Sequence, residues 1–456
     1  MSDALGTLMP GFVGLALPDW LEARLREGLG GVCIFGDNIE SLAQLRELTD
    51  SIRAANPDAL IAIDEEGGDV TRLYYGQGSP YPGNAVLGRL DNLALTERVG
   101  AAVGEQLLAV GCNLDFAPDA DANSNPDNPV IGVRSFGADA ELVARHTSAW
   151  VSGLQSAGVA ASVKHFPGHG DTAQDSHLAL PVVDRSLEQL RQRELVPFVA
   201  AIAAGTKTIM TSHILLPQLD PESPATLSRR ILQGVLREEL GFEGVIVSDA
   251  LDMAGASGEI GIPAAAARAI AAGCDLLCIG TDNTDAQLAE IVEALSSGSI
   301  SPERLAQAAK RNRALARELA APSAPRFAAP TFDPAETARA FDVRVARPSG
   351  PHTVIVLETE ANMAIGTAPW GPRGALRLRN GEPLPSAEGT LVIVGRDNHR
   401  HDWVRRLVDD VRAQHPPVVV IDMGWPGDDR AYADIATFGA SRHVGDALEA
   451  WLAGTL

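Results

Sequence analysis

One segment, Lys164–Pro181, concentrates side chains that can transfer protons or bind a metal ion. It reads KHFPGHGDTAQDSHLALP. Its titratable side chains lie within a few residues of one another: Lys164, His165, His169, Asp171, Asp175 and His177. A loop that only connects two elements rarely needs so many ionisable groups, and the glycines in it let the backbone approach a ligand closely. The segment is therefore the first candidate for a functional site.

Two kinds of chemistry fit this spacing. His169, Asp171, Asp175 and His177 have the side chains of a metal site. Alternatively, Asp175 orients His177, and His177 acts as a general acid and base. Spacing along the chain does not decide between a metal cage and an acid/base pair.

The elements around this segment predict a barrel. Short apolar runs alternate with amphipathic stretches up to about residue 320, and eight such units predict a (β/α)8, TIM-like barrel. The predicted strands are Gly11–Ala16, Gly31–Phe35, Leu60–Asp64, Asn113–Ala117, Ala160–His165, Thr208–His213, Gly244–Asp249 and Asp275–Gly280. The predicted helices include Leu93–Val110, Leu187–Ala204, Ser228–Glu239 and Pro263–Ala272.

Polar residues follow most of these predicted strands. They include Asp64, Glu65, Glu66, Asp115, Asp119, Lys164, His165, His213, Ser248 and Asp249. A single Asp after a strand is often only a helix N-cap. In a barrel, however, the carboxyl ends of all strands meet on one face, so that many polar residues at these ends predict a shared active site.

A second, smaller unit follows the barrel. We predict the barrel over residues 1–318, a linker rich in Ala and Pro over 319–349, and a small α/β domain over 350–456. Its predicted strands are Thr353–Leu357, Thr390–Gly395, Val418–Met423 and Asp434–Phe438, and its predicted helices are Trp403–Gln414 and Val444–Leu452. This pattern is typical of a doubly wound, flavodoxin-like sheet. It lacks a phosphate-binding glycine fingerprint, so we expect no nucleotide cofactor.

The composition excludes several partners. The chain has 456 residues and a formal net charge of -22, which argues against binding to nucleic acid or an anionic membrane. The N-terminus lacks the pattern of a signal peptide, and no apolar run is long enough to span a membrane. The four cysteines (Cys33, Cys112, Cys274 and Cys278) are scattered and predicted to be buried, reduced thiols. We therefore predict a cytoplasmic protein that is a monomer or small homo-oligomer.

Several motifs together resemble glycoside hydrolase family 3, in particular its bacterial β-N-acetylglucosaminidase branch of the two-domain type. The most specific is the KHFPGHGDT…DSH…LP block described above. The others are IDEEGG (Ile63–Gly68), NLDFAP (Asn113–Pro118), NPVIGVRSFG (Asn128–Gly137), TSHI (Thr211–Ile214) and IVSDALDM (Ile246–Met253). Their order and spacing fit the family over the whole barrel.

This resemblance implies a role for each candidate residue. Asp249 corresponds to the nucleophile of a retaining mechanism, His177 to the general acid/base, and Asp175 to its partner. Residues that correspond to sugar-binding positions are Asp64, Arg72, Arg134, Lys164 and His165, with Asp119 and His213 as further members of the site. The resemblance implies a small carbohydrate as substrate, and neither a metal nor a cofactor.

The chain also departs from the family pattern. The family usually has Gln, Arg and Asp where this chain has Glu65, Asp69 and Ala250. Glu65 and Asp69 place additional negative charge beside Asp64 along the chain, and we predict that they alter the sugar pocket.

The predicted function is hydrolysis of terminal β-linked N-acetylglucosamine from cell-wall or chitin fragments, by an exo-acting β-N-acetylhexosaminidase. The alternatives are a phosphorylase, which would use phosphate in place of water, and a β-glycosidase for another sugar. A metal-dependent hydrolase and a non-catalytic sugar-binding protein are further alternatives. The second of these is disfavoured because both Asp249 and His177 are present.

Overall fold

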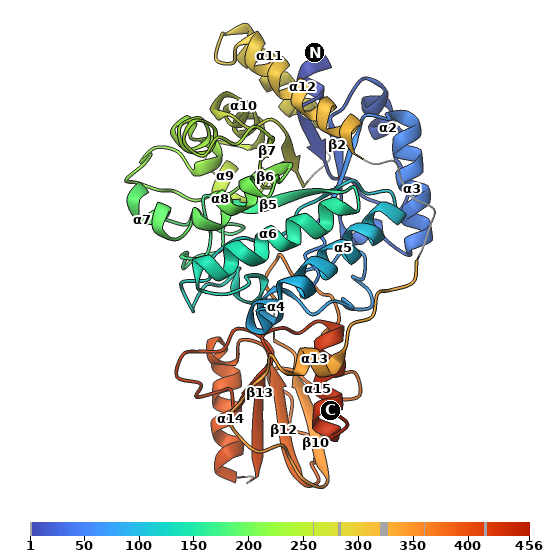
Figure 1. Cartoon of the computed structure of the whole chain (residues 1–456), viewed down its shortest axis with the longest axis vertical. Coiled ribbons are helices and arrows are strands. Elements are labelled where there is room, and N and C mark those ends of the chain that lie inside the picture. Colours follow the sequence, from blue (N-terminus) through green and yellow to red (C-terminus); the bar gives the residue numbers. More distant parts are fainter. Residues whose placement is uncertain (1, 259, 281–283, 320–326, 360, 415–416) are drawn as a thin grey trace.

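The protein consists of a larger and a smaller α/β unit, stacked along the long axis of the molecule (Figure 1). The computed structural model describes residues 2–456, apart from 259, 281–283, 320–326, 360 and 415–416. Part of the predicted linker therefore lies outside the described residues. No helix within the described ranges is both long and apolar enough to cross a membrane.

The larger unit is built on eight short parallel strands. These are β1 (Leu8–Pro10), β2 (Gly31–Ile34), β3 (Leu60–Ile63), β4 (Leu114–Asp115), β5 (Ala160–Phe166), β6 (Thr208–Thr211), β7 (Val245–Val247) and β8 (Leu277–Ile279). Strands β2 to β7 pair in chain order, and β1 pairs with β8. A bridge between Val247 and Leu276 joins β7 to the segment that enters β8, and β1 lies next to β2. The strands thus follow one another around a barrel, as predicted.

Helices cover the outside of this barrel. They are α1 (Ser2–Leu5), α2 (Asp19–Arg26), α3 (Leu42–Ala55), α4 (Asn84–Leu90), α5 (Leu93–Ala109), α6 (Ala140–Ser156), α7 (Leu187–Gln192), α8 (Val196–Ala203), η4 (Arg230–Glu239), α9 (Ala254–Ser257), α10 (Ile262–Ala272), α11 (Thr284–Ser296) and α12 (Pro302–Glu318). Short helical turns lie at η1 (Gly36–Asn38), η2 (Gly132–Arg134) and η3 (Ala225–Leu227). Several long helices begin at a side chain that accepts a backbone N–H, such as Asn92 before α5 and Asp139 before α6.

Two predicted elements were wrong in detail. The first strand is Leu8–Pro10 and not Gly11–Ala16, because the barrel buries Leu8 and Met9 completely while Val13 stays 92% exposed. The predicted helix Leu187–Ala204 is two helices, α7 and α8. The chain leaves helical geometry at Arg193, and Pro197 lies in the first turn of the second helix, where its missing N–H costs no hydrogen bond.

The smaller unit is a six-stranded sheet. Its strands are β9 (Asp342–Val343), β10 (His352–Leu357), β11 (Leu376–Leu378), β12 (Thr390–Gly395), β13 (Val418–Asp422) and β14 (Ile435–Ala436), in the spatial order β11-β10-β12-β13-β14-β9. All pairs are parallel except β14 with β9. The five parallel strands have the 2-1-3-4-5 order of flavodoxin-like folds, which agrees with the predicted class.

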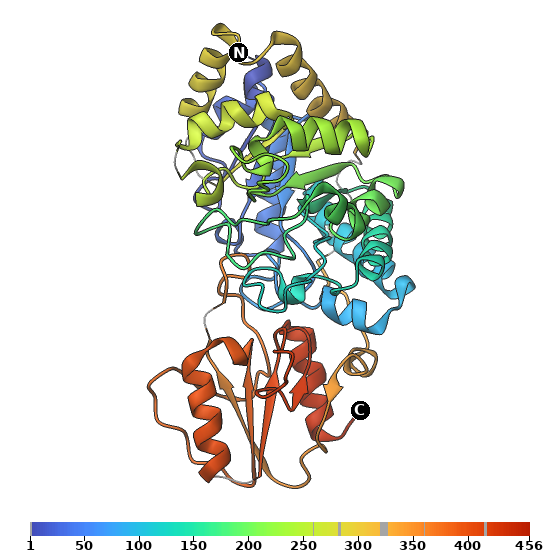
Figure 2. The ribbon, with the colours of Figure 1, turned by 90° about the vertical axis from the view of Figure 1, so that its left-hand side faces the viewer.

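Helices cover both faces of this small sheet (Figure 2). They are α13 (Pro334–Ala338), the turn η5 (Asn398–Arg400), α14 (Asp402–Gln414) and α15 (Arg442–Ala453). Along β12, Val392 and Val394 pack in the cluster with α15, whereas Leu391 and Ile393 pack in the cluster with α14. This alternation follows from the two-residue period of a strand. Helix α13 and strand β9 lie within the predicted linker, and both pack on the smaller unit.

A loop after β10 reaches from the smaller unit to the barrel (Figure 1). The side-chain amide of Asn362 donates to the carbonyls of Pro129 and Val130, at 3.3 Å each. The Arg72 guanidinium donates to the Ala364 carbonyl at 2.9 Å. The two units are therefore joined beside the carboxyl ends of the barrel strands.

Candidate active site

A cavity of about 340 Å³ opens at the carboxyl ends of the barrel strands. Most of the predicted site residues line it: Asp64, Arg72, Arg134, Lys164, His165, His177 and Asp249. Apolar side chains, among them Phe35, Phe116 and Met253, complete the wall. The barrel thus brings together residues that lie far apart in the sequence, and the volume suits a small polar molecule with one apolar face.

Asp249 lies just beyond the end of β7. One of its carboxylate oxygens accepts the N–H of Ala250 at 2.8 Å. Burial alone would raise the pKa of Asp249, but the neighbouring imidazoles of His213, His165 and His177 hold it below its usual value. A carboxylate that stays ionised and is fixed at a strand end is suited to nucleophilic attack.

His177 and Asp175 form a pair at the mouth of the cavity. Nδ1 of His177 lies 2.6 Å from a carboxylate oxygen of Asp175, which also accepts the backbone N–H of His177 at 2.9 Å. Burial would raise the pKa of Asp175, but these two hydrogen bonds lower it. Because Nδ1 faces Asp175, Nε2 is the nitrogen left to exchange a proton with a ligand. Asp175 itself does not line the cavity.

An ion-paired network forms one wall. Nζ of Lys164 lies 2.7 Å from both Asp64 and Glu66. The Arg134 guanidinium donates twice to Glu66, at 2.9 and 2.7 Å. Burial would raise the pKa of Glu66, but Arg134 and Lys164 hold it far below its usual range. The wall therefore presents fixed donors and acceptors, which is the chemistry that binds sugar hydroxyl groups.

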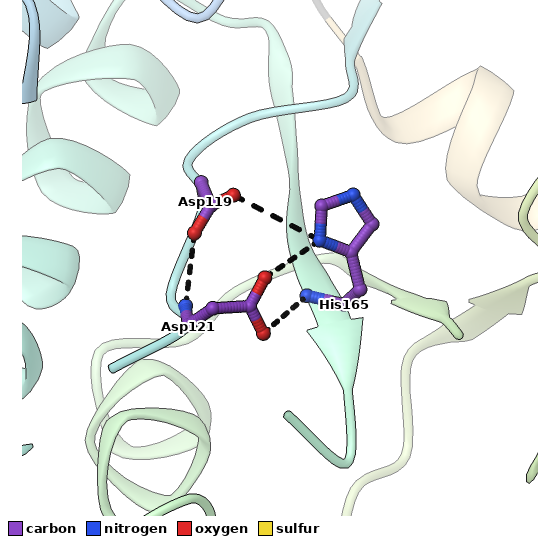
Figure 3. A group of neighbouring side chains, drawn as sticks. All are labelled: Asp119, Asp121 and His165. Atoms are coloured by element: carbon purple, nitrogen blue, oxygen red, sulfur yellow. Dashed lines mark hydrogen bonds and ion pairs between the residues drawn. The ribbon is translucent and has the colours of Figure 1, made fainter. Parts of the chain in front are cut away.

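His165 is held from behind by two aspartates (Figure 3). Its Nδ1 lies 2.7 Å from Asp121 and 3.8 Å from Asp119. Burial and then Asp121 raise the pKa of Asp119 well above its usual value, whereas His165 and His169 lower that of Asp121 despite its burial. This trio is the one group in the described part of the chain whose ligand atoms lie close enough to hold a metal ion. Asp121 also accepts the backbone N–H groups of His165 and His169, at 3.3 and 2.6 Å. These hydrogen bonds fix the conformation of the loop that begins at His165.

The residues of the alternative metal cage do not converge. His169 bonds to Thr172 and Ser176, at 2.7 and 2.9 Å, and burial lowers its pKa to about 4. Asp171 pairs with Arg185 and Arg193, while Asp175 pairs with His177. The geometry therefore favours the acid/base interpretation over the metal cage.

Two predicted members of the site lie behind the cavity wall. Asp119 is fully buried, 3.8 Å from Arg134. His213 is also fully buried; its ring lies 2.8 Å from the Thr226 hydroxyl and 3.0 Å from the Ala250 carbonyl. Neither side chain lines the cavity. His213 instead contacts the backbone of Ala250, the residue next to Asp249.

Glu65 and Asp69, which were predicted to alter the sugar pocket, do not line the cavity, so that prediction has no direct contact to support it. Glu65 points into its own loop and accepts hydrogen bonds from the Thr71 hydroxyl and the N–H groups of Arg72 and Leu73. Asp69 points to the smaller unit, where it accepts the N–H of Ala440 at 2.8 Å. Ala250, the third departure, does line the cavity.

The buried carboxyl group of Glu65 leads to a prediction about stability. Burial raises its pKa from 4.5 to about 7, so the folded chain holds a proton there that the unfolded chain releases near pH 4.5. Stability is thus lost as the pH rises through this window. Glu65→Gln cannot ionise, so its free energy of unfolding relative to wild type should rise by about 3 kcal/mol between about pH 4.5 and pH 8.

Urea unfolding at the two pH values measures this difference. The exposed Glu47 provides the control, since Glu47→Gln should show the same difference from wild type at both values. A Glu65→Gln variant that behaves as this control does would show that Glu65 is ionised in the folded chain throughout the window.

Several residues of the cavity wall were missing from the predicted site. Glu66 was noted among the polar residues that follow the strands but was not assigned to the site, and nothing in its local sequence indicated its burial between Arg134 and Lys164. Asp252 also lines the cavity, and it accepts the N–H of Gly280 at 2.6 Å. Met363 and Ala364 come from the smaller unit, and nothing in their local sequence indicates this position.

A barrel with a carboxylate and an Asp–His pair beside one cavity at its strand ends has the architecture of many TIM-barrel enzymes. Residues 20–315 match the family described as Glycosyl hydrolase family 3 N terminal domain. The chain belongs to glycosyl hydrolase family 3 and is a glycoside hydrolase, as the resemblance implied.

Named relatives agree with this family. The chain is 43% identical over 275 residues to a Beta-hexosaminidase of Pseudomonas aeruginosa (strain LESB58), covering 59% of this chain and 82% of that one. It is 36% identical over 337 residues to Beta-hexosaminidase A of Pseudoalteromonas piscicida, covering 67% of this chain and 56% of that one, so it matches little more than half of the longer relative.

The solved structure of a glycoside hydrolase family 3 β-N-acetylglucosaminidase from Paenibacillus sp. str. FPU-7 superposes with a TM-score of 0.87 at 31% identity. The match covers 100% of this chain and 96% of that one. Both units of the present chain therefore have counterparts in a protein of known structure.

Proposed function

We propose that the protein is a retaining exo-β-N-acetylglucosaminidase that releases terminal β-linked N-acetylglucosamine from cell-wall or chitin fragments. The observation that carries this proposal is the position of Asp249 and His177, which line the same cavity, with Asp175 bonded to His177 from outside. The names of the hexosaminidase relatives support the choice of sugar.

In the proposed first step, Asp249 attacks the anomeric carbon while His177 donates a proton to the departing oxygen. The bond to the leaving group breaks as the bond to Asp249 forms. In the second step, His177 takes a proton from water, which attacks the same carbon and releases Asp249. Asp175 keeps the His177 ring oriented through both steps and acts as a positioning residue.

Water is the proposed acceptor, with phosphate as the alternative. Among the described residues of the wall, Lys164 and Arg134 are ion-paired with Asp64 and Glu66. Arg72 donates to the Ala364 carbonyl and lies 3.9 Å from Asp64. Cations already balanced by carboxylates attract a dianion weakly, which favours a neutral acceptor.

Turnover of 4-nitrophenyl β-N-acetylglucosaminide, with and without phosphate, tests this proposal. We expect N-acetylglucosamine as the product under both conditions, and the matched β-glucoside should be cleaved much more slowly. N-acetylglucosamine 1-phosphate as the main product would establish the phosphorylase instead. Equal rates on both sugars would show a β-glycosidase of different specificity.

We also propose a cytoplasmic location for the protein. All four cysteines are buried and unpaired, which supports a reducing, cytoplasmic location. We infer a small carbohydrate as the binding partner and a monomer or small homo-oligomer as the assembly.

A further inference from the structure

A second cavity, of about 680 Å³, lies in the smaller unit. Residues at or beyond the carboxyl ends of β10 and β12 line it, among them Glu358 and Arg396. Strands β10 and β12 are neighbours in the sheet, and the chain continues from β10 to the opposite neighbour, β11, before it reaches β12. In doubly wound sheets, ligands bind outside the carboxyl ends of the strands at this switch point.

Arg396 is the buried cation of this cavity. Only 6% of the residue is exposed, and its guanidinium lies 4.3 Å from the centre of the Trp370 ring. Burial lowers the pKa of Arg396, while the charges of Asp69 and Asp397 raise it. No hydrogen-bond acceptor or carboxylate within bonding distance is present among the residues that the structure describes. A buried guanidinium without acceptors is costly unless a ligand or water supplies them.

Asp69 does not accept a hydrogen bond from the Arg396 guanidinium. Asp69 and Arg396 both line a separate hollow of about 10 Å³, and the second carboxylate oxygen of Asp69 has no partner in the described structure. A hollow of this size holds about one water molecule. Asp69 thus stabilises the positive charge of Arg396 from the side of the barrel, and it does not line the larger cavity.

Arg377 adds a second positive charge. Its guanidinium donates to the Trp370 carbonyl at 2.8 Å and lies 3.9 Å from Glu358. Glu358 is shared with Arg379, at 2.7 Å. Of the described residues that line this cavity, two are arginines and one, Glu358, is a carboxylate, so this part of the wall has an excess of positive charge in a chain whose net charge is -22. The occupant that this wall favours is an anion.

Met363 connects this cavity with the active site, because its side chain lines both. Ala364, the next residue, lines the active-site cavity and is tied to Arg72. A substrate with its terminal sugar between Asp249 and His177 can therefore extend past Met363 toward Arg377 and Arg396.

We propose that the second cavity binds a carboxylate on the leaving-group side of the substrate, through Arg396 and Arg377. This inference rests on the proposed function. It selects acidic cell-wall fragments, whose muramic acid carries a lactyl carboxylate, over chitin fragments, whose leaving sugars are neutral. The smaller unit is then the part of the chain that selects the leaving group.

A pair of disaccharides tests the inference. One is N-acetylglucosamine β-1,4-linked to N-acetylmuramic acid, and the other is its lactyl amide, which differs only in charge. Wild type should cleave the acid with a kcat/KM about tenfold or more above that of the amide, as expected for hydrogen bonds to a charged group. In Arg396→Gln and in Arg377→Gln this ratio should fall toward one.

Arg373→Gln is the matched control, because Arg373 lies in the same unit, pairs with Asp446 and does not line the cavity. It should keep the wild-type ratio. A thermal melt shows whether Arg396→Gln is folded. If it is not, the ratio measured for Arg377→Gln, at an exposed position, tests the inference alone. A wild-type ratio near one, or an unchanged ratio in Arg377→Gln and in any folded Arg396→Gln, would overturn the inference. A wild type that cleaves no aryl N-acetylglucosaminide would overturn the proposed function and the leaving-group assignment together.

Discussion

Replacing Asp249 by Asn is expected to lower kcat for 4-nitrophenyl β-N-acetylglucosaminide by about 10³-fold or more, since it removes the atom that forms the covalent bond. The amide keeps the size of the carboxylate, and its oxygen can still accept the N–H of Ala250, so the fold should be retained. Steady-state kinetics with a thermal melt on the same sample measure both effects.

Asp252 provides the matched carboxylate for this experiment. It lines the same cavity, but its side chain accepts the N–H of Gly280, so Asp252→Asn should cost much less activity than Asp249→Asn. A fluorinated N-acetylglucosaminyl donor that slows the second step should label Asp249 and leave Asp252 unlabelled. Near wild-type turnover in Asp249→Asn would remove Asp249 from the mechanism.

His177→Ala is expected to separate substrates by their leaving group. An activated aryl group departs without a proton, whereas a sugar alcohol needs one. The rate of cleavage should therefore fall by about 10²-fold or more for a disaccharide. The rate of the first turnover of the 4-nitrophenyl substrate should fall much less. The second step still needs a base, so the covalent intermediate should accumulate and a burst of nitrophenol should appear. Added azide needs no base and should restore turnover as a β-glycosyl azide.

Two further variants control for this experiment. Asp175→Asn should show a weaker form of the same pattern, because it removes the acceptor 2.6 Å from Nδ1 but keeps the imidazole. His169→Ala should change both substrates by a similar factor, since the ring of His169 bonds to Thr172 and Ser176. If leaving-group dependence in His177→Ala matches wild type and azide has no effect, another group is the acid/base.

Local sequence was sufficient for the features that depend on neighbours along the chain. The alternation of apolar strands with amphipathic helices predicted both units, because burial of strand faces and helix stripes is encoded in short periods. The pairing of Asp175 with His177 needs only two residues of loop. Their spacing left it open beside a metal cage, and the resemblance to the family selected it. Asp249 was placed at a strand end by the apolar run before it and by the motif around it.

Contacts between distant segments decided the rest. Glu66 pairs with Arg134 across 68 residues of sequence, and its side chain points into the cavity while the adjacent Glu65 points into its own loop. No local pattern distinguishes two neighbouring glutamates, since the direction of each depends on which partners the barrel brings close. The first strand shows the same effect, because pairing with β8 selected Leu8–Pro10 over the apolar run beside it.

The contribution of the smaller unit to the two cavities was also decided by the tertiary structure alone. The sequence determined that a barrel carries Asp249 and His177 and that a smaller sheet follows it. Only the packing of the two units places Met363 in the active-site wall and leaves Arg396 buried beside an open cavity. The physical reason is that burial and charge pairing between units depend on distances in space, which local sequence periods do not encode.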